Sequence, residues 1–512
     1  MSKMPILGSI IKGAIGIRSS IPSRKNAYKQ QVRQLKKLIA KAQFTDFGNH
    51  FNFSELALQD DPIKTFQKNV PLYDYQGIFD AWWHRALKGE RDICWPGKIN
   101  YFALSSGTSE SASKHIPVTK AMIKSIQRGT LRQVLSTKHF NFPKEQFETE
   151  ILFVGGSTNL NFNGTYFSGD LSGITTGTQP RWFQNFTLPG PEIRSQSNWE
   201  NKLQDLVLNA KKWDVGFICG VPAWIQILFE KIIKHYNVKT IHDVWPNLAI
   251  FVHGGVSIQP YKESINALCG KDLIYMDTYM ASEGFIAYQE RPNELQGMKL
   301  LTDNLIFFEF IPFNEENFDS EGNVKPHVET IDLKSVELNK DYALVISNSA
   351  GAWRYLIGDT IRFTDLDRNE VIVTGRTKHF LSLCGEHLSV DNMNKAINLA
   401  SKDLGVIINE YCVEGKPYQG LFAHHWYIGT DRPVDELLLK EKLDEHLKTL
   451  NDDYAVERKH ALKEIIVTVL PNQTFIDFLA SKNKLGGQSK FPRVLKGKQL
   501  NEWLAFLANH KK

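Results

Sequence analysis

The stretch that decides the fold is Ser105-Ser106-Gly107-Thr108-Ser109, which Lys114 follows closely. It comes directly after residues 99–104, a short apolar run that ends in small residues and predicts a strand running into a loop. Thr119 then opens a predicted helix that reaches about Leu135, with the threonine as its N-cap. The hydroxyl-rich loop therefore joins a strand to a region that leads into a helix.

The composition of this loop suits a phosphate group. Backbone N–H groups of a tight loop and Ser/Thr hydroxyls supply many donors at short range, and Gly107 lets the backbone approach closely. The charge of Lys114 can neutralise a β- or γ-phosphate. The loop is not a Walker A motif, because the pattern GxxxxGK[ST] is absent. A Ser-rich surface turn is the alternative, but the preceding strand and the following Lys-x-x-Pro favour a phosphate loop.

Length and composition indicate a globular protein of at least two domains. The 512 residues are too many for one ordinary core, and 42% apolar with 23% charged residues is typical of folded chains. The net charge of +5 is a mild excess without a dense Lys/Arg run, so no nucleic acid partner is expected. No run of about 18 apolar residues occurs, so no membrane span is expected.

Cysteine usage and the first residues bear on location. The five cysteines are scattered and form no CxxC pair, which argues against a zinc ribbon or a disulfide scaffold and fits a reducing cytoplasm. Residues 1–12 look superficially like a signal peptide, but Lys12 and Arg18 interrupt the apolar stretch and no small-residue cleavage site follows. We therefore expect a cytoplasmic protein whose N-terminal helix lies on its surface.

The coarse pattern along the chain is α/β. Predicted helices and short apolar strands alternate through the central part, which indicates layers with much parallel pairing: helices at 199–211 and 222–235, and strands at 151–154, 215–219, 248–253 and 273–277. From Leu301 the pattern changes to strands joined by polar turns, which predicts a β-rich subdomain: 305–312, 342–347, 360–364 and 370–373. After residue 376 it becomes α+β. We place the boundary near residue 378, giving a large domain 1–378 and a small domain 379–512.

Further segments follow predicted strands at intervals that one nucleotide site can use: His253-Gly254-Gly255-Val256, Tyr279-Met280-Ala281-Ser282-Glu283-Gly284, Tyr355-Leu356-Ile357-Gly358-Asp359 and Gly375-Arg376-Thr377-Lys378. With Gly220-Val221-Pro222-Ala223-Trp224 and residues 484–493, they resemble the Gretchen Hagen family of acyl-acid amido synthetases, the auxin-responsive promoter proteins and their bacterial relatives. The similarity runs from about residue 26 to about residue 500. This family is part of the adenylate-forming superfamily, which includes acyl-CoA ligases and firefly luciferase.

The resemblance implies a luciferase-like architecture and an ATP-dependent ligase. The large N-terminal domain, of layered sheets and helices, would bind ATP and the acyl group, and the small mobile C-terminal domain would carry a catalytic lysine. A carboxylic acid would be activated as acyl-AMP with release of pyrophosphate, and the acyl group would pass to an amino acid with release of AMP. ATP and Mg²⁺ are the implied cofactors, and a small-molecule acid and an amino acid are the implied partners.

The resemblance also assigns residues. Nucleotide binding is assigned to Ser105, Ser106, Thr108, Ser109, Lys114, Gly255, Tyr279, Met280, Ala281, Ser282, Asp359 and Lys378. Within this set Asp359 matches the carboxylate that binds the ribose hydroxyls. Glu283 matches the acidic residue that helps to hold Mg²⁺, for which an oxygen ligand is the right type. Arg376 and Lys378 match the hinge before the small domain. Lys490 matches the lysine that reaches the site during adenylation; Lys490, Glu283 and Arg376 are the predicted catalytic residues.

Each assignment has a structural alternative. Asp359 could cap a turn, Glu283 could be a first-turn acid of a helix, and Arg376 could be an ion-pair partner. The weaker acyl-binding candidates share this ambiguity, since a tryptophan or a histidine is often simply buried: Asp170, Trp224 and His253. The phosphate loop continues Glu110-Ser111-Ala112-Ser113 without the glycine usual in plant members, which is the bacterial style of the family. Plant hormone substrates are therefore not transferred to this chain.

Three functions remain in competition. The first is the acyl acid–amido synthetase, and the second is a thioester-forming ligase on the same fold, with CoA as the acceptor. The third is a nucleotide-binding protein without catalysis, against which Lys490 argues, because a mere binder needs no lysine from a second domain. The sequence identifies neither the acid, nor the amine, nor the oligomeric state.

Overall fold

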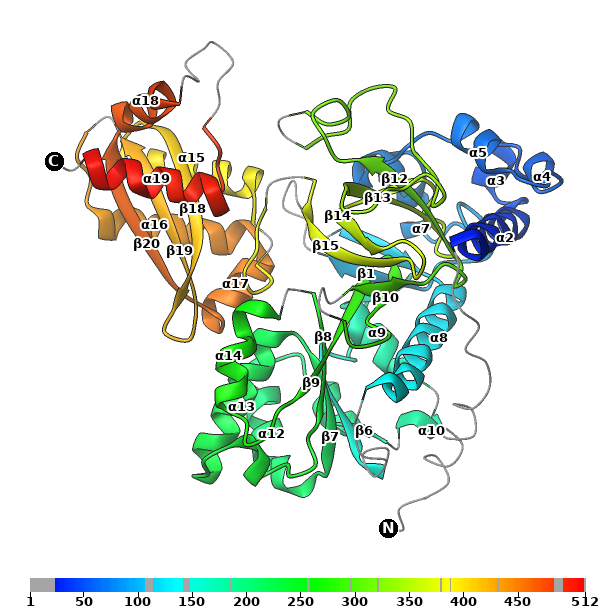
Figure 1. Cartoon of the computed structure of the whole chain (residues 1–512), viewed down its shortest axis with the longest axis horizontal. Coiled ribbons are helices and arrows are strands. Elements are labelled where there is room, and N and C mark those ends of the chain that lie inside the picture. Colours follow the sequence, from blue (N-terminus) through cyan, green and yellow to red (C-terminus); the bar gives the residue numbers. More distant parts are fainter. Residues whose placement is uncertain are drawn as a thin grey trace. The chain divides into compact units, whose positions relative to one another are not determined.

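The fold is given by a computed structural model that describes residues 24–105, 114–140, 148–179, 181–184, 186–255, 258–293, 297–319, 322–377, 380–386, 388–430, 432–482 and 491–510. These residues form two compact units (Figure 1). The first unit contains the described residues up to Thr377, and the second contains those from Phe380 onward. The break lies beside the boundary predicted at residue 378, while the roles predicted for the two domains remain predictions.

The first unit is built on an eleven-stranded sheet with the order β12-β13-β14-β15-β11-β10-β9-β8-β7-β3-β6. One half pairs in parallel: β6 (Thr187–Leu188), β3 (Glu150–Val154), β7 (Val215–Gly220), β8 (Ile250–Gly254) and β9 (Ile274–Ala281). The other half is antiparallel: β10 (Gly284–Tyr288), β11 (Met298–Leu300), β12 (Ile306–Pro312), β13 (Asp341–Asn348), β14 (Tyr355–Asp365) and β15 (Glu370–Arg376). The predicted β-rich subdomain is thus the antiparallel half of the same sheet.

A second, four-stranded sheet in the first unit has the order β2-β1-β5-β4: β1 (Tyr101–Ser105), β2 (Lys114–Val118), β4 (Asn161–Phe162) and β5 (Phe167–Gly169). Strands β1 and β2 are antiparallel and lie on either side of the predicted phosphate loop. This sheet therefore carries the two ends of that loop.

Helices cover both sheets: α2 (Arg24–Ala42), α3 (Asp46–His50), α4 (Phe53–Leu56), α5 (Ile63–Asn69), α6 (Tyr75–Ile78), α7 (His84–Leu87), α8 (Lys120–Ser136), α9 (Leu171–Gly177), α10 (Arg181–Gln184), α11 (Pro191–Arg194), α12 (Trp199–Asn209), α13 (Pro222–Tyr236) and α14 (Gln259–Ala267). Helices α12, α13 and α14 lie along one side of the parallel strands (Figure 1). Helix α8 begins as predicted, because the Thr119 side chain accepts a hydrogen bond from the N–H of Met122.

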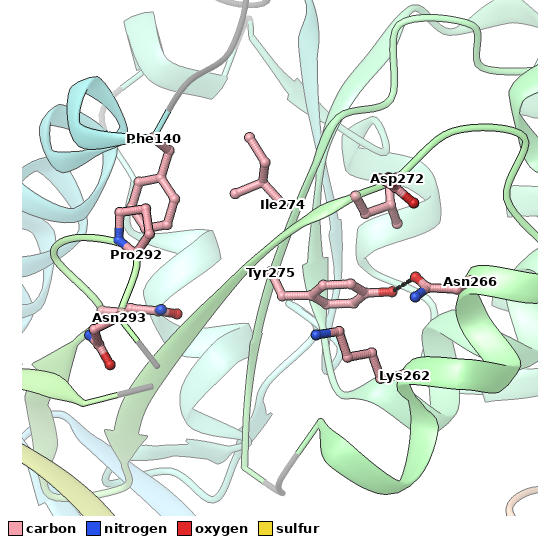
Figure 2. Close-up of a pocket in the computed structure, with 10 residues that line it drawn as sticks. Phe140, Lys262, Asn266, Asp272, Ile274, Tyr275, Pro292 and Asn293 are labelled. Carbon is pink, nitrogen blue, oxygen red and sulfur yellow. Dashed lines mark hydrogen bonds between the residues drawn. The ribbon is translucent and has the colours of Figure 1, made fainter. Parts of the chain in front are cut away.

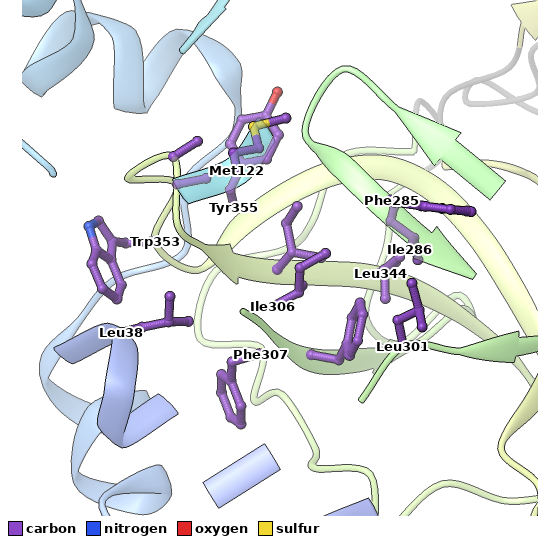
Figure 3. Close-up of a cluster of buried hydrophobic side chains, with 14 of the residues drawn as sticks. Leu38, Met122, Phe285, Ile286, Leu301, Ile306, Phe307, Leu344, Trp353 and Tyr355 are labelled. Carbon is purple, nitrogen blue, oxygen red and sulfur yellow. The ribbon is translucent and has the colours of Figure 1, made fainter. Parts of the chain in front are cut away.

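The core of the first unit joins the N-terminal helices to the antiparallel half of the sheet. Leu38 of α2 and Trp353, which precedes β14, are fully buried in one cluster with Phe307 of β12 (Figure 3). The apolar face of α2 is therefore packed on this core. Tyr355 of β14 belongs to the same cluster, so the core reaches the start of the strand that carries Asp359.

The second unit is α+β, as predicted. Its three-stranded sheet pairs β18 (Ile408–Tyr418) with β19 (Leu421–Thr430) antiparallel and β19 with β20 (Leu462–Pro471) in parallel. A separate hairpin consists of β16 (Phe380–Leu381) and β17 (Leu388–Ser389). The helices are α15 (Val390–Leu404), α16 (Glu436–Leu450), α17 (Asp452–Lys459), α18 (Asn472–Ser481) and α19 (Gly497–His510). Trp503 of α19 is fully buried in an aromatic core with Phe475 and Phe491.

Most predicted elements agree with these bounds to within a few residues, but two strands are longer. Strand β9 extends to Ala281, and β14 starts at Tyr355, so both nucleotide segments are partly in strands. The predicted N-terminal surface helix lies within residues 1–23, outside the described residues. Among the helices of the described part, none has the length and apolar character needed to cross a bilayer.

Candidate active site

The two ends of the predicted phosphate loop are neighbours. Ser105 ends β1 and pairs with Lys114, the first residue of β2. Ser106, Thr108 and Ser109 lie outside the described residues, so their role remains a prediction. The ammonium group of Lys114 lies over the ring of Tyr75, 5.2 Å from its centroid, which is within reach of a cation–π interaction.

Glu283 occupies the turn between β9 and β10, at the point where the large sheet changes from parallel to antiparallel. It is 7% exposed. The Asn348 side-chain amide donates to the backbone carbonyl of Glu283 at 2.7 Å, and Gly284 has a φ of +145°, which favours glycine. Glu283 is therefore a residue of a fixed, buried turn between strands, not a first-turn acid of a helix.

Asp359 lies on β14 directly opposite Arg376 on β15. The Arg376 Nε is 3.1 Å from Asp359 Oδ1, and the Tyr279 hydroxyl donates to Asp359 Oδ2 at 2.6 Å. Asp359 and Tyr279 are both buried. Asp359 is thus a strand residue held by two donors and not a turn cap, whereas Arg376 does form the ion pair that its structural alternative proposed.

The electrostatics of Glu283 connect these groups. Burial, followed by the charge of Asp359, raises the pKa of Glu283 to about 7, and the charges of Lys114 and Arg376 act in the opposite direction. Burial and the carboxylates of Asp359 and Glu283 also raise the pKa of Tyr279, so its phenol stays protonated. Four segments of the chain therefore bring two carboxyl groups and two cations within electrostatic reach of one another.

This arrangement suits a nucleotide with a divalent cation. Two acidic groups that lie close together make each other harder to ionise. A cation bound between these groups and a phosphate makes their ionisation easier. Within the described ranges no group of three or more His, Cys, Asp and Glu side chains has metal-ligand geometry. Mg²⁺ typically binds to one or two carboxylates plus substrate phosphates, so the buried carboxylate of Glu283 fits it as a protein ligand.

Of the other predicted nucleotide residues, some lie on the strands next to this cluster and some are not among the described residues. Gly255 follows β8 with a φ of +83°, a conformation that disfavours any side chain. Ala281 and Ser282 connect Tyr279 to Glu283, and Met280 is partly exposed. Lys378 and Lys490 are not among the described residues.

The acyl-binding candidates are not brought together. Asp170 caps α9 by accepting from the N–H of Ser172 at 2.6 Å. Trp224 packs edge-on against Trp199 with ring centroids 4.5 Å apart. His253 is 2% exposed, its Nδ1 lies 3.5 Å from Asp277 Oδ1, and burial lowers its pKa to about 3. Asp170 and Trp224 thus have structural contacts, whereas neither ring nitrogen of the buried His253 has a hydrogen-bond partner among the described residues. Acyl binding by all three remains a prediction.

A pocket of about 480 Å³ lies near the start of β9 (Figure 2). In it the ammonium group of Lys262 lies 5.6 Å from the ring centroid of Tyr275, whose hydroxyl donates to Asn266 Oδ1 at 2.5 Å. Its described lining includes none of the predicted site residues. The nucleotide cluster is therefore identified by its charges and contacts and not by this pocket.

Three residues of the cluster were missed by the sequence interpretation. Tyr75 lies under Lys114, and Asn348 fixes the Glu283 turn. Tyr355 is buried, and its pKa is raised by burial and then by the charge of Glu283. Tyr355 opens one of the quoted segments, so position in that segment could have indicated it. Asn348 and Tyr75 are 65 and 40 residues away from the backbone groups they bind, and no local pattern signals such contacts.

Comparisons with known proteins agree on one family. Family models match three successive parts of the chain: the GH3 family N-terminal domain at residues 22–220, the central domain at 299–370 and the C-terminal domain at 391–499. A jasmonoyl–L-amino acid synthetase, JAR4, of Nicotiana attenuata is 22% identical over 92% of each chain. An indole-3-acetic acid-amido synthetase, GH3.4, of Arabidopsis thaliana is 26% identical over 59% of this chain and 55% of its own length.

Solved structures show the same fold at low identity. An acyl acid amido synthetase, AtGH3.15, in complex with 2,4-DB, has a TM-score of 0.60 and 17% identity, covering 99% of this chain and 97% of that one. A 2-hydroxyisobutyryl-CoA ligase in complex with 2-HIB-AMP and CoA has a TM-score of 0.55 and 12% identity, covering 95% and 93%. These full-length matches confirm the predicted α/β fold class of the adenylate-forming ligases.

Proposed function

Because the chain belongs to the GH3 family, we propose that it is an ATP-dependent acyl acid–amido synthetase. A carboxylate oxygen of the acid attacks the α-phosphorus of ATP, and pyrophosphate leaves as the acyl-adenylate forms. The nitrogen of an amino acid then attacks the acyl carbon, the bond to AMP breaks, and the nitrogen loses a proton. The proposed partners are thus a small-molecule carboxylic acid and an amino acid, and a cytoplasmic location stays a prediction.

The observation that carries this proposal is the convergence of Lys114, Glu283, Asp359 and Arg376 from four segments of the first unit. Glu283 and Asp359 are both buried, and two buried carboxyl groups within electrostatic reach of each other are costly unless they serve a ligand or a specific contact. Asp359 has each oxygen oriented by one donor, Tyr279 or Arg376. Each oxygen keeps a further lone pair, which we assign to the ribose hydroxyls of ATP.

Lys114 and Glu283 would act at the phosphate end. The ammonium group of Lys114 neutralises phosphate charge, and Glu283 would hold Mg²⁺ together with phosphate oxygens. When bound, the metal ion supplies positive charge that stabilises the departing pyrophosphate. The charges of Lys114 and Arg376 favour the ionised form of Glu283, the form that a metal ion requires.

Asp359→Asn tests the proposed cluster. An asparagine amide is uncharged and has one acceptor oxygen, so it cannot accept from both Tyr279 and Arg376 as the carboxylate does. Acid-dependent exchange of labelled pyrophosphate into ATP should therefore fall about 100-fold. The matched control is Asp341→Asn, because Asp341 forms a similar cross-strand pair with Arg362, at 2.9 and 2.7 Å, outside the cluster. Equal losses in both variants would contradict the proposed role of Asp359.

Lys490 is proposed, from the family resemblance, to stabilise the charge that builds up during adenylation. We expect Lys490→Ala to lose most of the acid-dependent exchange while equilibrium binding of ATP is mostly retained. The variant would also reject the third hypothesis, a nucleotide binder without catalysis, because a binder shows no acid-dependent exchange to lose. Unchanged exchange in Lys490→Ala would overturn the proposed mechanism.

The second candidate is a thioester-forming ligase, since a CoA ligase shares the fold. Both reactions begin with the same adenylate, so pyrophosphate exchange cannot separate them. The deciding measurement is AMP release with ATP, Mg²⁺ and a panel of acids, supplemented either with the twenty amino acids or with CoA. Release that depends on an amino acid supports the synthetase, and release that depends on CoA alone would replace it with the ligase.

A further inference from the structure

We propose that Tyr75 is a positioning residue for Lys114, and that it sets the place of the phosphate-end cation in the adenylation site. The inference rests on the proposed function, because it concerns the binding of ATP at that site. Tyr75 comes from α6 and is outside every segment that the sequence interpretation assigned to the nucleotide.

Tyr75 holds the start of β2 in two ways. Its hydroxyl accepts the backbone N–H of His115 at 2.9 Å, and its ring faces the ammonium group of Lys114, 5.2 Å from the centroid. One side chain therefore contacts both the backbone and the cation at the point where the chain returns from the predicted phosphate loop. A cation over a ring face in this distance range is attracted by the ring quadrupole.

The ring of Tyr75 is itself fixed. Asp74 caps α6 by accepting from the N–H of Gly77 at 2.8 Å, and the ring of Phe79 stacks on Tyr75 with centroids 5.6 Å apart. Trp83 packs edge-on against Tyr75 at 6.2 Å. Because packing fixes the rotamer of Tyr75, its ring can hold the flexible Lys114 side chain in one place, which a lysine surrounded by solvent would not keep.

The segment that carries Tyr75 is tied to the strand that carries the other site residues. Tyr73 donates its N–H to the carbonyl of Arg354 at 3.0 Å and accepts from the N–H of Leu356 at 2.8 Å, as a short parallel bridge to β14. Trp83 also lies against Tyr355 at 5.6 Å. The segment of Tyr75 is therefore bonded to the strand that carries Tyr355 and Asp359, and Tyr75 in turn contacts Lys114.

The chemistry of Tyr75 limits its role to positioning. Burial raises the pKa of its phenol, and the hydrogen bond from His115 acts in the opposite direction. The phenol thus stays protonated at neutral pH and supplies no base. Tyr75 offers a ring face to the Lys114 ammonium group and a hydroxyl lone pair to the His115 N–H. Substitution by leucine removes both, and substitution by phenylalanine removes only the hydroxyl.

The test is a double-mutant cycle of Tyr75→Leu and Lys114→Met on the whole chain. We expect Tyr75→Leu to raise the KM for ATP in acid-dependent pyrophosphate exchange about ten-fold with a smaller change in kcat, because the ring face is lost. Tyr75→Phe keeps the ring and should raise it only two- to three-fold. In the Lys114→Met background the further effect of Tyr75→Leu should fall below about two-fold, because the two residues act as one unit.

Additive effects in the cycle would overturn the proposal, since they would mean that Tyr75 does not act through Lys114. Tyr342→Phe is the matched control, because the Tyr342 hydroxyl also accepts one backbone N–H, that of Glu337 at 2.9 Å, away from the cluster. A rise in KM for this variant equal to that of Tyr75→Phe would reduce Tyr75 to a structural residue and overturn the proposal too.

Folding and function are controlled separately. If Tyr75→Leu does not fold, by its thermal midpoint, the comparison of Tyr75→Phe with Tyr342→Phe decides. If the wild-type chain shows no exchange with any acid, the proposed function fails, and the same cycle is measured by equilibrium binding of ATP. Coupling in that assay supports the positioning role without the reaction, and absence of ATP binding overturns both proposals.

Discussion

Glu283 in the first unit and Glu386 in the second unit are both buried, yet their carboxyl groups have opposite surroundings. Burial and the charge of Asp359 raise the pKa of Glu283 to about 7. The pKa of Glu386 is lowered to about 2, although burial alone would raise it, because His424 and backbone N–H groups donate to it. The same side chain is thus prepared for two different tasks.

The carboxylate of Glu386 is bound on several sides within its own unit. The His424 Nε2 lies 2.8 Å from Oε1, and both side chains are fully buried. The N–H groups of Leu383 and Cys384 donate to it at 2.8 and 2.9 Å, and the Cys384 thiol lies 3.3 Å away. These donors close the turn between β16 and β17. Glu386 therefore fixes the conformation of this hairpin.

The surroundings of Glu283 include another acid. Asp359 opposes its ionisation, and burial followed by the charge of Glu283 raises the pKa of the neighbouring Tyr355. The cations Lys114 and Arg376 favour ionisation but do not bring the pKa to its ordinary value. The negative charge of such a carboxylate is only partly neutralised by the protein, so a bound cation stabilises it most. The difference indicates that Glu386 serves the fold and that Glu283 serves the ligand.

The largest expected effect is the loss of adenylation in Glu283→Gln. An amide has the same shape but no charge for a divalent cation, so acid-dependent pyrophosphate exchange should fall at least about 100-fold. Glu386→Gln is the matched control, with the same chemical change in the other unit. If the two variants lost adenylation equally per folded molecule, the proposed difference between the two carboxylates would be wrong.

Stability should respond in the opposite order. Glu386→Gln removes the buried charge that accepts from His424, Leu383 and Cys384, and losing buried hydrogen bonds to a charged group costs about 3 kcal/mol of unfolding free energy. Glu283→Gln removes a carboxylate that is costly to ionise, and should stabilise the ligand-free protein at pH 8 by about 1–2 kcal/mol. Denaturant unfolding of both variants measures this. A destabilised Glu283→Gln would show that Glu283 holds structure.

The pH dependence sharpens the same contrast. A raised pKa means that the folded state binds more protons, so the contribution of Glu283 to stability falls as pH rises from 4.5 through about 7. A lowered pKa means that the contribution of Glu386 is present above 4.5 and is lost as pH falls toward about 2. Thermal midpoints over this range should therefore differ from wild type mainly above 4.5 for Glu283→Gln. For Glu386→Gln the difference should shrink only below 4.5.

The sequence predicted the role of Glu283 in this comparison but not that of Glu386. Glu283, Asp359 and Arg376 were predicted because they belong to short segments in a recognisable order, and α8 was predicted because its cap is local. The sequence interpretation gave Glu386 no role. Its partner His424 lies 38 residues away on another strand, and that distance has no signature in the sequence.

The sheet architecture escaped prediction for a similar reason. Strands β10 and β11 are short, and they join the parallel half to the β-rich half of one sheet. Pairing between strands is decided by tertiary packing and not by the propensity of a segment. Asp170 shows the converse case: a predicted acyl-pocket residue whose side chain caps α9. Local capping of this kind is frequent for aspartate and competes with any functional reading.

The smallest expected effect compares one tyrosine in each unit. The Tyr279 hydroxyl donates to Asp359 at 2.6 Å, and the Tyr427 hydroxyl donates to Glu414 at 2.8 Å. Removing a hydrogen bond to a charged group costs about 1.5 kcal/mol, so Tyr279→Phe should raise the KM for ATP about ten-fold through a less well oriented Asp359. Tyr427→Phe should lower the unfolding free energy by a similar amount and leave that KM unchanged. A rise in KM for both variants would mean that the nucleotide site depends on general stability. A rise in the KM for ATP in Tyr279→Phe alone would support a role of Asp359 and its hydroxyl donor in ligand binding, because of the two carboxylates only Asp359 is proposed to bind a ligand.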